Sequence, residues 1–459
     1  MRWFNSANGL IILRNDMPYN SNFVAVPSHP LDIHQVRWTH DEQNQKYRSP
    51  FSKDRDRILY SNSFLRLRGK TQIFMLHKND YIRTRLTHTL EVAQIAKTIG
   101  KALGLNLELI EAIAFGHDVG HTPFGHVGER TLEDIIKEDK KILDANKGFK
   151  HNLQALRLFC ELEKGADFPN SMGLNLTKYT LWGIAHHSSI KAHVDQNDKL
   201  IHPIETDHPI YDRYLNGIDA YWSFEGYVVA IADEIAQRHH DIEDGLLYGI
   251  INRKELLNQV KKFQTLFGRY EKKCMKRLQN EIWNLEVPVF NALFARLVVN
   301  LYVTNVIDNT KMNIKQFEEE FDIARLQDFY DQKQNIAKDR HKNIVSMSTN
   351  LSRCDSVFQE FLKEQILSSY QVQAMDGKAK YIVRKLYEAF TNNPDQLPDT
   401  SLFSYAQLQG LGHTISRADI LNHKTDNVEL MHRCIVDYIG GMTDQFAYDE
   451  FDRLYGTRI

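Results

Sequence analysis

Residues 117–129, HDVGHTPFGHVGE, hold three histidines, one aspartate and one glutamate within thirteen positions. Four helix breakers, Gly120, Pro123, Gly125 and Gly128, lie among them. Imidazole and carboxylate groups can coordinate a divalent metal ion, and they can also transfer protons near neutral pH. The breakers imply that the chain turns here, which would direct several titratable side chains to one place. We therefore interpret this segment as the centre of a metal-dependent or acid–base active site.

Two further residues complete a candidate metal-binding set with the adjacent His117 and Asp118. His88 lies inside the amphipathic segment RTRLTHTLEVAQIA, where an unpaired imidazole would be poorly placed. Asp233 follows the apolar run VVAIA, and a buried carboxylate must be paired or metal-bound. Two imidazoles and two carboxylates from three helices suit Mg, Mn, Fe, Co or Zn, and they leave coordination positions open for water and substrate.

Each of these residues also has a simpler interpretation. A single histidine on a helix is more often a hydrogen-bonded core residue, and a single aspartate in an apolar helix is more often salt-bridged. The order His, His-Asp, Asp on separate helices, with the central pair in a glycine-rich segment, favours a metal centre over both.

The segments that would position these residues are helical. Apolar residues recur at three-to-four spacing in residues 87–103, 106–118, 223–245 and 289–308, and Asn106 is a plausible N-cap. A small strand or hairpin fits only YIVRKLY or HVDQNDKLIHPIET. We predict an all-α fold with a C-terminal helical extension.

Composition narrows the class of protein. The chain has 459 residues, 42% hydrophobic and 25% charged, with a net charge of -2, which gives no global attraction to nucleic acid or to an anionic membrane. Its four cysteines are scattered without a CxxC pair, which is typical of a reduced intracellular protein. The apolar run 10–13 is too short for a signal peptide or a membrane span. We expect a cytoplasmic protein that does not enter a membrane.

The motifs resemble a known family. RTRLTHTLEVAQIA, FGHDVGHTPFGHVGE and VAIADEIA are similar to the HD-domain superfamily of metal-dependent phosphohydrolases. FLRLRGKTQIF, FKHNLQALRLF, GLNLTKYTLWGI, HDIEDG and DYIGGMTDQFA narrow the resemblance to its deoxyguanosinetriphosphate triphosphohydrolase branch, over roughly residues 50–447. The resemblance implies the helical HD fold with extra helices. It also implies hydrolysis of dGTP, with other dNTPs as alternatives, to a deoxynucleoside and intact triphosphate.

The resemblance also assigns roles. It maps the metal ligands onto His88, His117, Asp118 and Asp233, and the catalytic pair onto His126 and Glu129. A carboxylate one helical turn from a histidine can orient it and raise its pKa, although Glu129 could instead favour its own helix N-terminus. His121 and His151 resemble accessory histidines around the phosphates. Whether the nucleophile is a metal-bound water or one held by His126 and Glu129, or whether His126 protonates the leaving 5′ oxygen, stays open.

Substrate contacts are expected from further residues. A triphosphate needs cations, and Arg85 lies one turn before His88, so it can share the helix face that looks at the metal. Arg66 is a second candidate from the basic stretch 53–85. The family pattern adds residues that line the nucleotide pocket: Gln72, Asn152 and Gln154.

The sugar should lie near the helix that holds Asp233. Asp241 is eight residues further on, and the family has an aspartate here that accepts from the ribose 3′-hydroxyl. Gln237 stands where the family commonly has a tyrosine beside the sugar, which makes the strictness of deoxyribose selection an open question. His186 and His187 stand where relatives often carry Lys-Tyr, and we interpret them as surface histidines, with altered contacts to the base as the alternative.

Alternatives remain. HD proteins also include nucleotidases and cyclic-nucleotide phosphodiesterases, and a dNTP-regulated sensor or nucleic-acid binder is a second class. The net charge does not support nucleic acid as the main ligand, although a local basic patch would allow it. The resemblance implies a homo-oligomer and allows an allosteric dNTP. We expect a peripheral segment at 1–50, the HD phosphohydrolase core at 51–250 and a helical region at 251–459, packed as one continuous domain.

Overall fold

The helices around the candidate site begin at side-chain caps that the sequence provides. Helix α3 (Arg85–Leu103) starts at Thr84, whose hydroxyl accepts from the backbone N–H of Thr87, and it ends at Gly104 with φ 74°. Helix α4 (Leu107–Gly116) starts at Asn106, whose side chain accepts from the N–H of Leu109, as predicted.

The computed structural model describes residues 36–37, 47–72, 83–142, 148–164, 173–188, 193–194, 200–201, 208–215, 222–332, 336, 344–411 and 415–456. The earlier helices are α1 (Pro50–Leu59), α2 (Asn62–Arg66), α3, α4, α5 (Gly125–Glu138), α6 (His151–Arg157), α7 (Lys178–His186), α8 (Pro209–Leu215) and α9 (Phe224–Leu247). The later helices are α10 (Arg253–Val260), α11 (Arg269–Asn280), α12 (Val287–Glu320), α13 (Leu326–Gln332), α14 (Thr349–Leu367), α15 (Tyr370–Asn392), α16 (Asp399–Gln409), α17 (Arg417–Asn422), α18 (Val428–Gly440) and α19 (Asp444–Tyr455).

The predicted all-α class is confirmed. The strands within the described residues, β1 (His193–Val194) and β2 (Leu200–Ile201), form one short antiparallel hairpin in which His193 pairs with Ile201. This hairpin lies in the segment HVDQNDKLIHPIET, where a hairpin was one alternative. The other alternative, YIVRKLY, is wrong, because these residues form part of α15.

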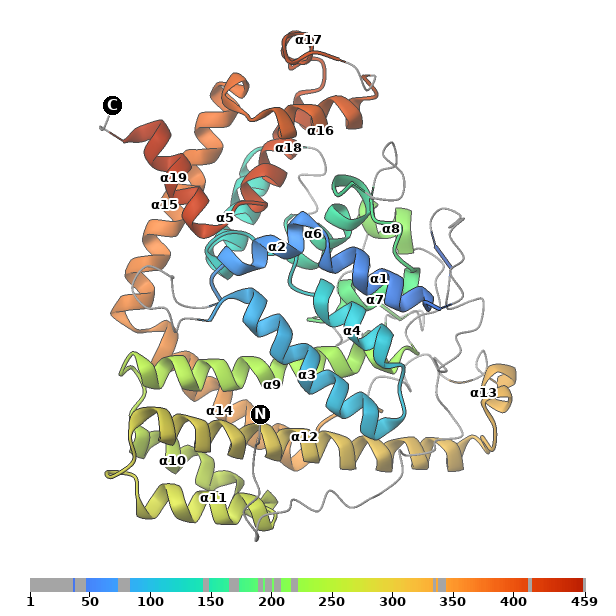
Figure 1. The fold of residues 1–459 in the computed structure, drawn as a ribbon, viewed down its shortest axis with the longest axis vertical. Helices are drawn as coiled ribbons and strands as arrows, with labels where there is room; N and C mark the ends of the chain where they lie inside the picture. The colour runs from blue at the N-terminus through green and yellow to red at the C-terminus, as the bar shows by residue number, and fades with distance from the viewer. Residues whose placement is uncertain are drawn as a thin grey trace.

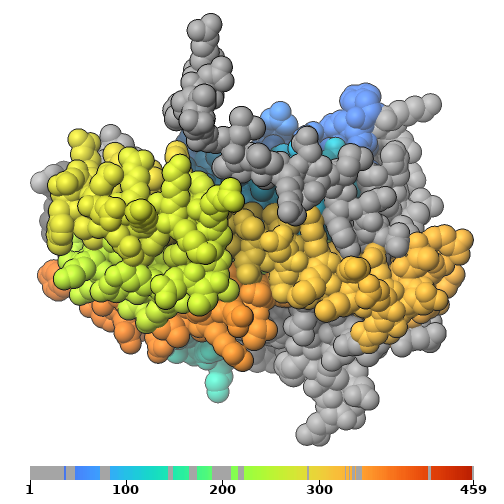
Figure 2. All heavy atoms as spheres, turned by 90° about the horizontal axis from the view of Figure 1, so that it is seen from below, coloured from blue at the N-terminus to red at the C-terminus, as the bar shows by residue number. Residues whose placement is uncertain are grey.

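The core is layered around α9. Helices α3 and α4 pack on one side of α9, α12 packs on another, and α11 lies against α12 (Figure 1). Seen from below, the described surface is largely made of α10, α11, α12 and α13 (Figure 2). One hydrophobic cluster runs through these layers, from Phe51 in α1 to Val372 in α15, and so crosses residue 250. The buried layers hold α3, α4 and α9 together.

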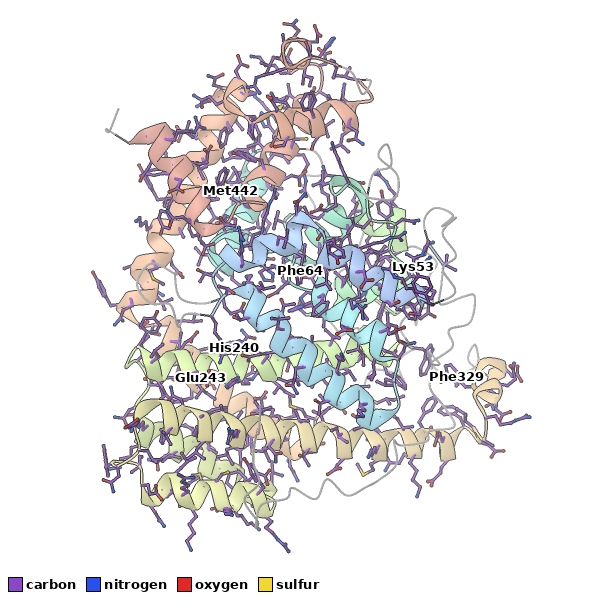
Figure 3. All side chains as sticks on the ribbon, in the orientation of Figure 1. Lys53, Phe64, His240, Glu243, Phe329 and Met442 are labelled. Carbon is purple, nitrogen blue, oxygen red and sulfur yellow. The ribbon has the colours of Figure 1, made fainter. Side chains whose placement is uncertain are left out.

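A second hydrophobic cluster joins α5 to the C-terminal helices. It contains Phe124 and Leu132 from the α5 region together with side chains of α15, α16, α18 and α19, including Met442 from the α18–α19 connection (Figure 3). The C-terminal helices therefore pack directly on the helix that begins with the GHVGE motif. The division of the chain near residue 250 stays a prediction, and most of residues 1–50 lie outside the described residues.

Helix α12 is 34 residues long and largely apolar. Among the described residues, its section Val289–Glu320 is the only helical stretch long and apolar enough to cross a membrane by length and composition. A core helix passes the same test, and α12 packs against α3, α9 and α11.

Candidate active site

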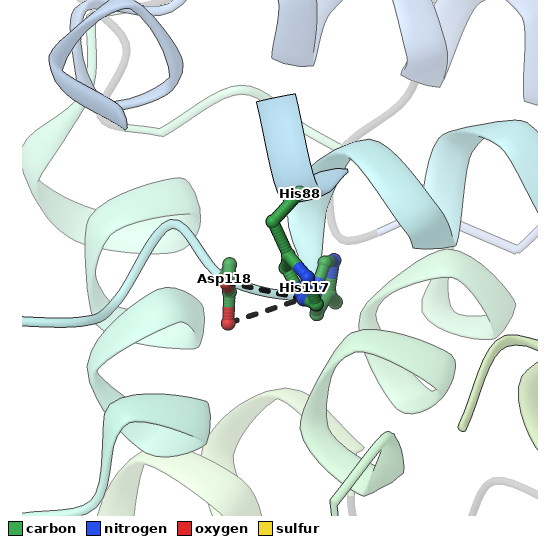
Figure 4. Close-up of side chains that lie close together, drawn as sticks. All are labelled: His88, His117 and Asp118. Carbon is green, nitrogen blue, oxygen red and sulfur yellow. Dashed lines mark ion pairs between the residues drawn. The ribbon is translucent and has the colours of Figure 1, made fainter. Parts of the chain in front are cut away.

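The four predicted metal ligands meet where the first turn of α3 and the C-terminal end of α4 lie against the middle of α9. The Nε2 atom of His88 lies 2.8 Å from Oδ1 of Asp233 and 3.8 Å from Oδ2 of Asp118. The Nε2 atom of His117 lies 3.5 Å from Oδ1 of Asp118 and 3.8 Å from Oδ1 of Asp233. Figure 4 shows the side chains of His88, His117 and Asp118 close together, with dashed lines that join Asp118 to both histidines.

The hydrogen bonds of His117 prepare it for a metal ion. Its Nδ1 lies 2.6 Å from the carbonyl oxygen of Ala114, so Nδ1 carries the proton and donates it. The fully buried Nε2 atom, with its lone pair, has no hydrogen-bond partner among the described residues. A buried polar atom without a partner is destabilising unless a ligand satisfies it, so this side chain fits a metal ion.

Electrostatics keep both carboxylates ionised. Burial raises the pKa of Asp118, but the charge of Arg85, together with the interactions with His121 and His117, outweighs it and holds the pKa well below its usual range. Burial also raises the pKa of Asp233. The hydrogen bond with His88 and the interaction with His117 outweigh this effect, so the pKa of Asp233 lies below its usual value. A buried carboxylate, Asp118, and a partly buried one, Asp233, both ionised and beside two imidazoles, are a donor set suited to a hard or borderline divalent cation.

Two glycines in residues 117–129 serve different structural purposes. A Cβ atom on Gly120 would lie 1.9 Å from the carbonyl oxygen of His151, so Gly120 lets α6 approach the loop that follows the His-Asp pair. Gly125 has φ 60° and Phe124 before it has φ 63°, which turns the chain into α5.

The turn into α5 brings three side chains into a second group. The Nδ1 atom of His126 lies 3.2 Å from Oε2 of Glu129, and the Nδ1 atom of His151 lies 2.9 Å from Oε1 of Glu129. The backbone N–H of His151 donates to the same Oε1 at 2.9 Å. Burial raises the pKa of Glu129, but His151 and His126 lower it far more strongly, so the carboxylate stays ionised.

His121 links the group of His126, Glu129 and His151 to the metal cluster, by which we mean His88, His117, Asp118 and Asp233. Its Nδ1 lies 3.1 Å from Oδ1 of Asp118, and its ring stacks on that of His151 with centroids 3.8 Å apart. Burial and the charges of Arg85 and His151 hold the pKa of His121 well below its usual value, so its ring is neutral. The structure thus brings together every histidine that was placed at the phosphates or in catalysis.

The interpretation of His186 and His187 as surface residues is wrong, because both are buried, at 2% and 3% exposure. The ring of His186 stacks on Trp182 with centroids 4.4 Å apart. The Nε2 atom of His187 lies 3.3 Å from Nε2 of His151, and its ring lies against that of His117 at 5.0 Å. His187 therefore belongs to the site, and the end of an apolar helix, LWGIA, was the signal for its burial.

Arg85 is positioned as its helical register predicts. The side chain is 1% exposed, and Nη1 donates to Oδ2 of Asp118 at 2.8 Å. Its Nε and Nη2 atoms have no partner among the described residues, and neither has the buried Oε1 atom of Gln72. Two unused guanidinium donors beside the metal cluster are suited to an anionic ligand.

Asp241 lies close enough to the metal cluster for an electrostatic interaction with His88, which lowers the pKa of Asp241 slightly against the effect of burial. Its buried Oδ1 atom has no hydrogen-bond partner in the described part of the chain. Burial raises the pKa of Asp241 to about 7, so the group can accept or donate a hydrogen bond near neutral pH. Gln237 is half-buried, one helical turn before it.

Three predicted nucleotide contacts have protein partners instead. Gln154 donates to Asp437 at 2.9 Å and accepts from Arg433 at 2.6 Å. Asn152 donates to the carbonyl oxygen of Ala185 at 2.7 Å. Exposed Arg66 donates to the carbonyl oxygen of Gly441 at 3.3 Å. Their roles toward a nucleotide stay predictions.

The C-terminal helices brace the catalytic loop, a feature that sequence reasoning missed. Asp444 accepts from the backbone N–H of Phe124 at 2.8 Å and from that of Thr71 at 3.0 Å. Buried Lys70 donates to the carbonyl oxygen of His121 and, at 3.0 Å, to that of Gly440. The motif DYIGGMTDQFA was recognised, but nothing in it shows which distant backbone groups it holds.

A second group behind His88 was also missed. His240 in α9 is fully buried, and its Nδ1 lies 3.1 Å from Nδ1 of His88. Its Nε2 lies 2.5 Å from Oε2 of Glu91, one turn after His88 in α3. His240 lies seven positions, or about two helical turns, after Asp233, so the helical register indicated that both side chains share one face of α9.

Comparisons with known proteins agree with this geometry. The family model for the HD domain matches residues 85–221, and that for the phosphohydrolase-associated domain matches residues 345–453. The chain is 32% identical to a deoxyguanosinetriphosphate triphosphohydrolase-like protein of Geobacter metallireducens over 91% of each chain. Proteins with the same description in Bartonella tribocorum and Roseobacter denitrificans are 32% and 33% identical over 95% and 91% of this chain, and over 96% and 94% of theirs.

The helical fold, the paired His-Asp cluster and the matched domain define a hydrolase of the HD-domain class, whose members are metal-dependent. Within that class, the similarity along most of both chains places the protein in one branch. The chain belongs to the family of deoxyguanosinetriphosphate triphosphohydrolase-like proteins.

Proposed function

We propose that this protein hydrolyses dGTP, with other dNTPs as alternative substrates, to the deoxynucleoside and inorganic triphosphate, with a bound divalent metal ion. The observation that carries the proposal is the convergence of four ligand side chains around the unpartnered Nε2 atom of His117. The choice of dGTP as the substrate is supported by the descriptions of the relatives at 32–33% identity.

The metal would be held by Nε2 of His88 and of His117 and by carboxylate oxygens of Asp118 and Asp233. Mn, Mg, Fe and Co all accept this set of ligands. A divalent ion bound there polarises a phosphoryl oxygen and lowers the pKa of a bound water towards neutrality. Arg85 keeps Asp118 ionised and oriented through the 2.8 Å hydrogen bond, and its other nitrogens can donate to phosphate oxygens.

Proton transfer is assigned to His126 with Glu129. Glu129 is fixed by two hydrogen bonds from His151, and it orients the ring of His126 through Nδ1. The His126 side chain is 55% exposed, so its Nε2 is accessible to water and to a leaving group. In this position His126 either activates the attacking water or protonates the departing 5′ oxygen.

Asp241 and Gln237 are proposed for the sugar. The unpartnered Oδ1 of Asp241 is suited to a hydroxyl hydrogen bond, which favours the ribose 3′-hydroxyl as its partner. Gln237 is shorter than the tyrosine that is common in the family, so GTP is included in the test. A homo-oligomer, an allosteric dNTP and a cytoplasmic location stay predictions of the resemblance.

The test is a product assay by anion-exchange chromatography, with Mn or Mg and each dNTP or GTP. We expect triphosphate and deoxyguanosine from dGTP, and a loss of about 10²-fold or more in His126→Ala. The matched control is His423→Ala, because His423 forms a similar exposed pair with Asp426 three residues away, at 2.6 Å. Orthophosphate or pyrophosphate as the product would instead indicate a nucleotidase or another HD phosphohydrolase.

A further inference from the structure

A hydrogen-bonded chain runs from the metal cluster to the edge of the protein. It consists of His88, His240 and Glu91, joined by distances of 3.1 Å and 2.5 Å. Figure 3 shows His240 between α3 and α9, with Glu243 further along α9. Arg83 forms ion pairs with both Glu91 and Glu243, and His239 lies 3.3 Å from Glu91, so the outer carboxylate is held from several sides.

With a metal ion on Nε2 of His88, the geometry of this chain determines its proton positions. Two Nδ1 atoms 3.1 Å apart require one donor and one acceptor. If Nε2 of neutral His88 binds a metal ion, its proton is on Nδ1, and His88 is the donor. Nδ1 of His240 is then the acceptor, so the proton of neutral His240 is on Nε2, where it faces the Glu91 carboxylate. Every polar atom in the chain has a suitable partner in this arrangement.

We propose that His240 and Glu91 form a positioning pair that fixes the tautomer and ring orientation of His88 for metal binding. The inference rests on the proposed metal site and deepens it. His240 does not touch the metal in this proposal. It acts through His88, as second-layer partners of metal-bound histidines do elsewhere, although the usual partner is a carboxylate or carbonyl and here a histidine is interposed.

The same group could be mistaken for a second metal centre, because Glu91, His239 and His240 bring ligand atoms within 4.8 Å of one another. A metal ion on Nε2 of His240 would force the proton of the neutral ring onto Nδ1. Nδ1 of His88 would then have to accept, and the proton of His88 would occupy Nε2, where the first metal ion binds. The two centres therefore exclude each other while both rings are neutral, and the guanidinium of Arg83 opposes a second cation.

The test is a calorimetric titration of the full-length, chelator-treated protein with Mn²⁺, without nucleotide. His240→Leu removes the acceptor, and we expect Mn²⁺ affinity to fall by about 10- to 100-fold at an unchanged stoichiometry of one. His240→Asn keeps an oxygen near the position of Nδ1 and should restore part of this loss. Glu91→Gln, which alters only the outer end of the chain, should cause a smaller but measurable loss.

Two reference variants make the result interpretable. His432→Leu removes a histidine that lies 2.9 Å from a carboxylate, that of Asp139, away from the metal cluster, and should bind Mn²⁺ as the wild type does. His88→Ala should abolish binding. Unchanged affinity in both His240→Leu and Glu91→Gln would overturn the inference, as would two ions in the wild type with one lost in His240→Leu. Normal binding by His88→Ala would overturn the proposed metal site and the inference with it. Melting in excess chelator checks that each variant folds.

Discussion

Gly120 gives the sharpest test of how the site is assembled. An added Cβ atom would lie 1.9 Å from the carbonyl oxygen of His151 and 2.5 Å from the backbone nitrogen of Ala155, whereas real Cβ contacts under 3.0 Å essentially never occur. The loop and the start of α6 must therefore separate by about 1 Å in Gly120→Ala. Both neighbours are backbone atoms, so no side chain can rotate away to relieve the contact.

The expected penalty is at the upper end for overpacking, about 3 kcal/mol of unfolding free energy. Because His121 follows Gly120 directly and His151 supports Glu129, a shift of about 1 Å should also reduce the hydrolysis rate by about 10²-fold. Gly377 is the control, since it lies exposed inside α15 and an added Cβ atom meets nothing within 4 Å. Gly377→Ala should leave activity unchanged and raise stability by about 0.5–1 kcal/mol.

The assay is urea denaturation followed by circular dichroism, with triphosphate release measured on the same samples. If Gly120→Ala unfolds within about 0.5 kcal/mol of the wild type and retains its rate, the close approach of the two segments does not constrain the site. In that case the explanation given for Gly120 would be wrong.

Three further predictions concern pH, metal and sugar. Burial raises the pKa of Glu225 from 4.5 to about 7. The contribution of this carboxyl group to the unfolding free energy is therefore fully present below pH 4.5 and is lost as pH rises through 7. Relative to Glu225→Gln, the unfolding free energy of the wild type should fall by about 3 kcal/mol over that range in denaturant titrations, and parallel pH profiles would contradict this. Mn²⁺ at 100 times its Kd should stabilise the fold by about 2.7 kcal/mol, measured by chemical denaturation, and His88→Ala should show no such gain. Gln237→Tyr should raise the ratio of dGTP to GTP turnover in paired kinetic assays, and an unchanged ratio would exclude residue 237 as the sugar gate.

Helical periodicity was enough to predict how the metal cluster comes together. His88 lies at a register that turns inward with the apolar residues of α3, and His117 directly follows the buried end of α4, so the pattern that buries Val92 or Ile113 also directs these two side chains. Asp233 lies on α9 at a partly buried position that faces them. The capping by Asn106 was predictable for the same reason, because a cap depends on residues only three positions away.

Contacts between distant segments were not predictable in this way. Gln154 is joined to Asp437 across 283 positions, and no local pattern indicates such a partner. The burial of His187 depends on packing at the end of α7, and a histidine pair beside polar residues suggests a surface when it is considered alone. His240 was within reach of register arguments, but its partner Glu91 lies in another helix, 149 residues away.

The brace formed by Lys70 and Asp444 has a consequence for the order in which the protein is made. Phe124 and Thr71 obtain their side-chain acceptor only from residue 444, and the second carbonyl contact of Lys70 is Gly440. During synthesis the metal ligands of α3, α4 and α9 emerge first, while the turn that presents His126 still lacks these contacts. A nascent or proteolytically shortened chain could therefore retain the cation without organising the proton-transfer pair. If the protein has the proposed function, hydrolysis would begin only once the C-terminal helices have docked, and nucleotide breakdown would then be limited to fully synthesised molecules.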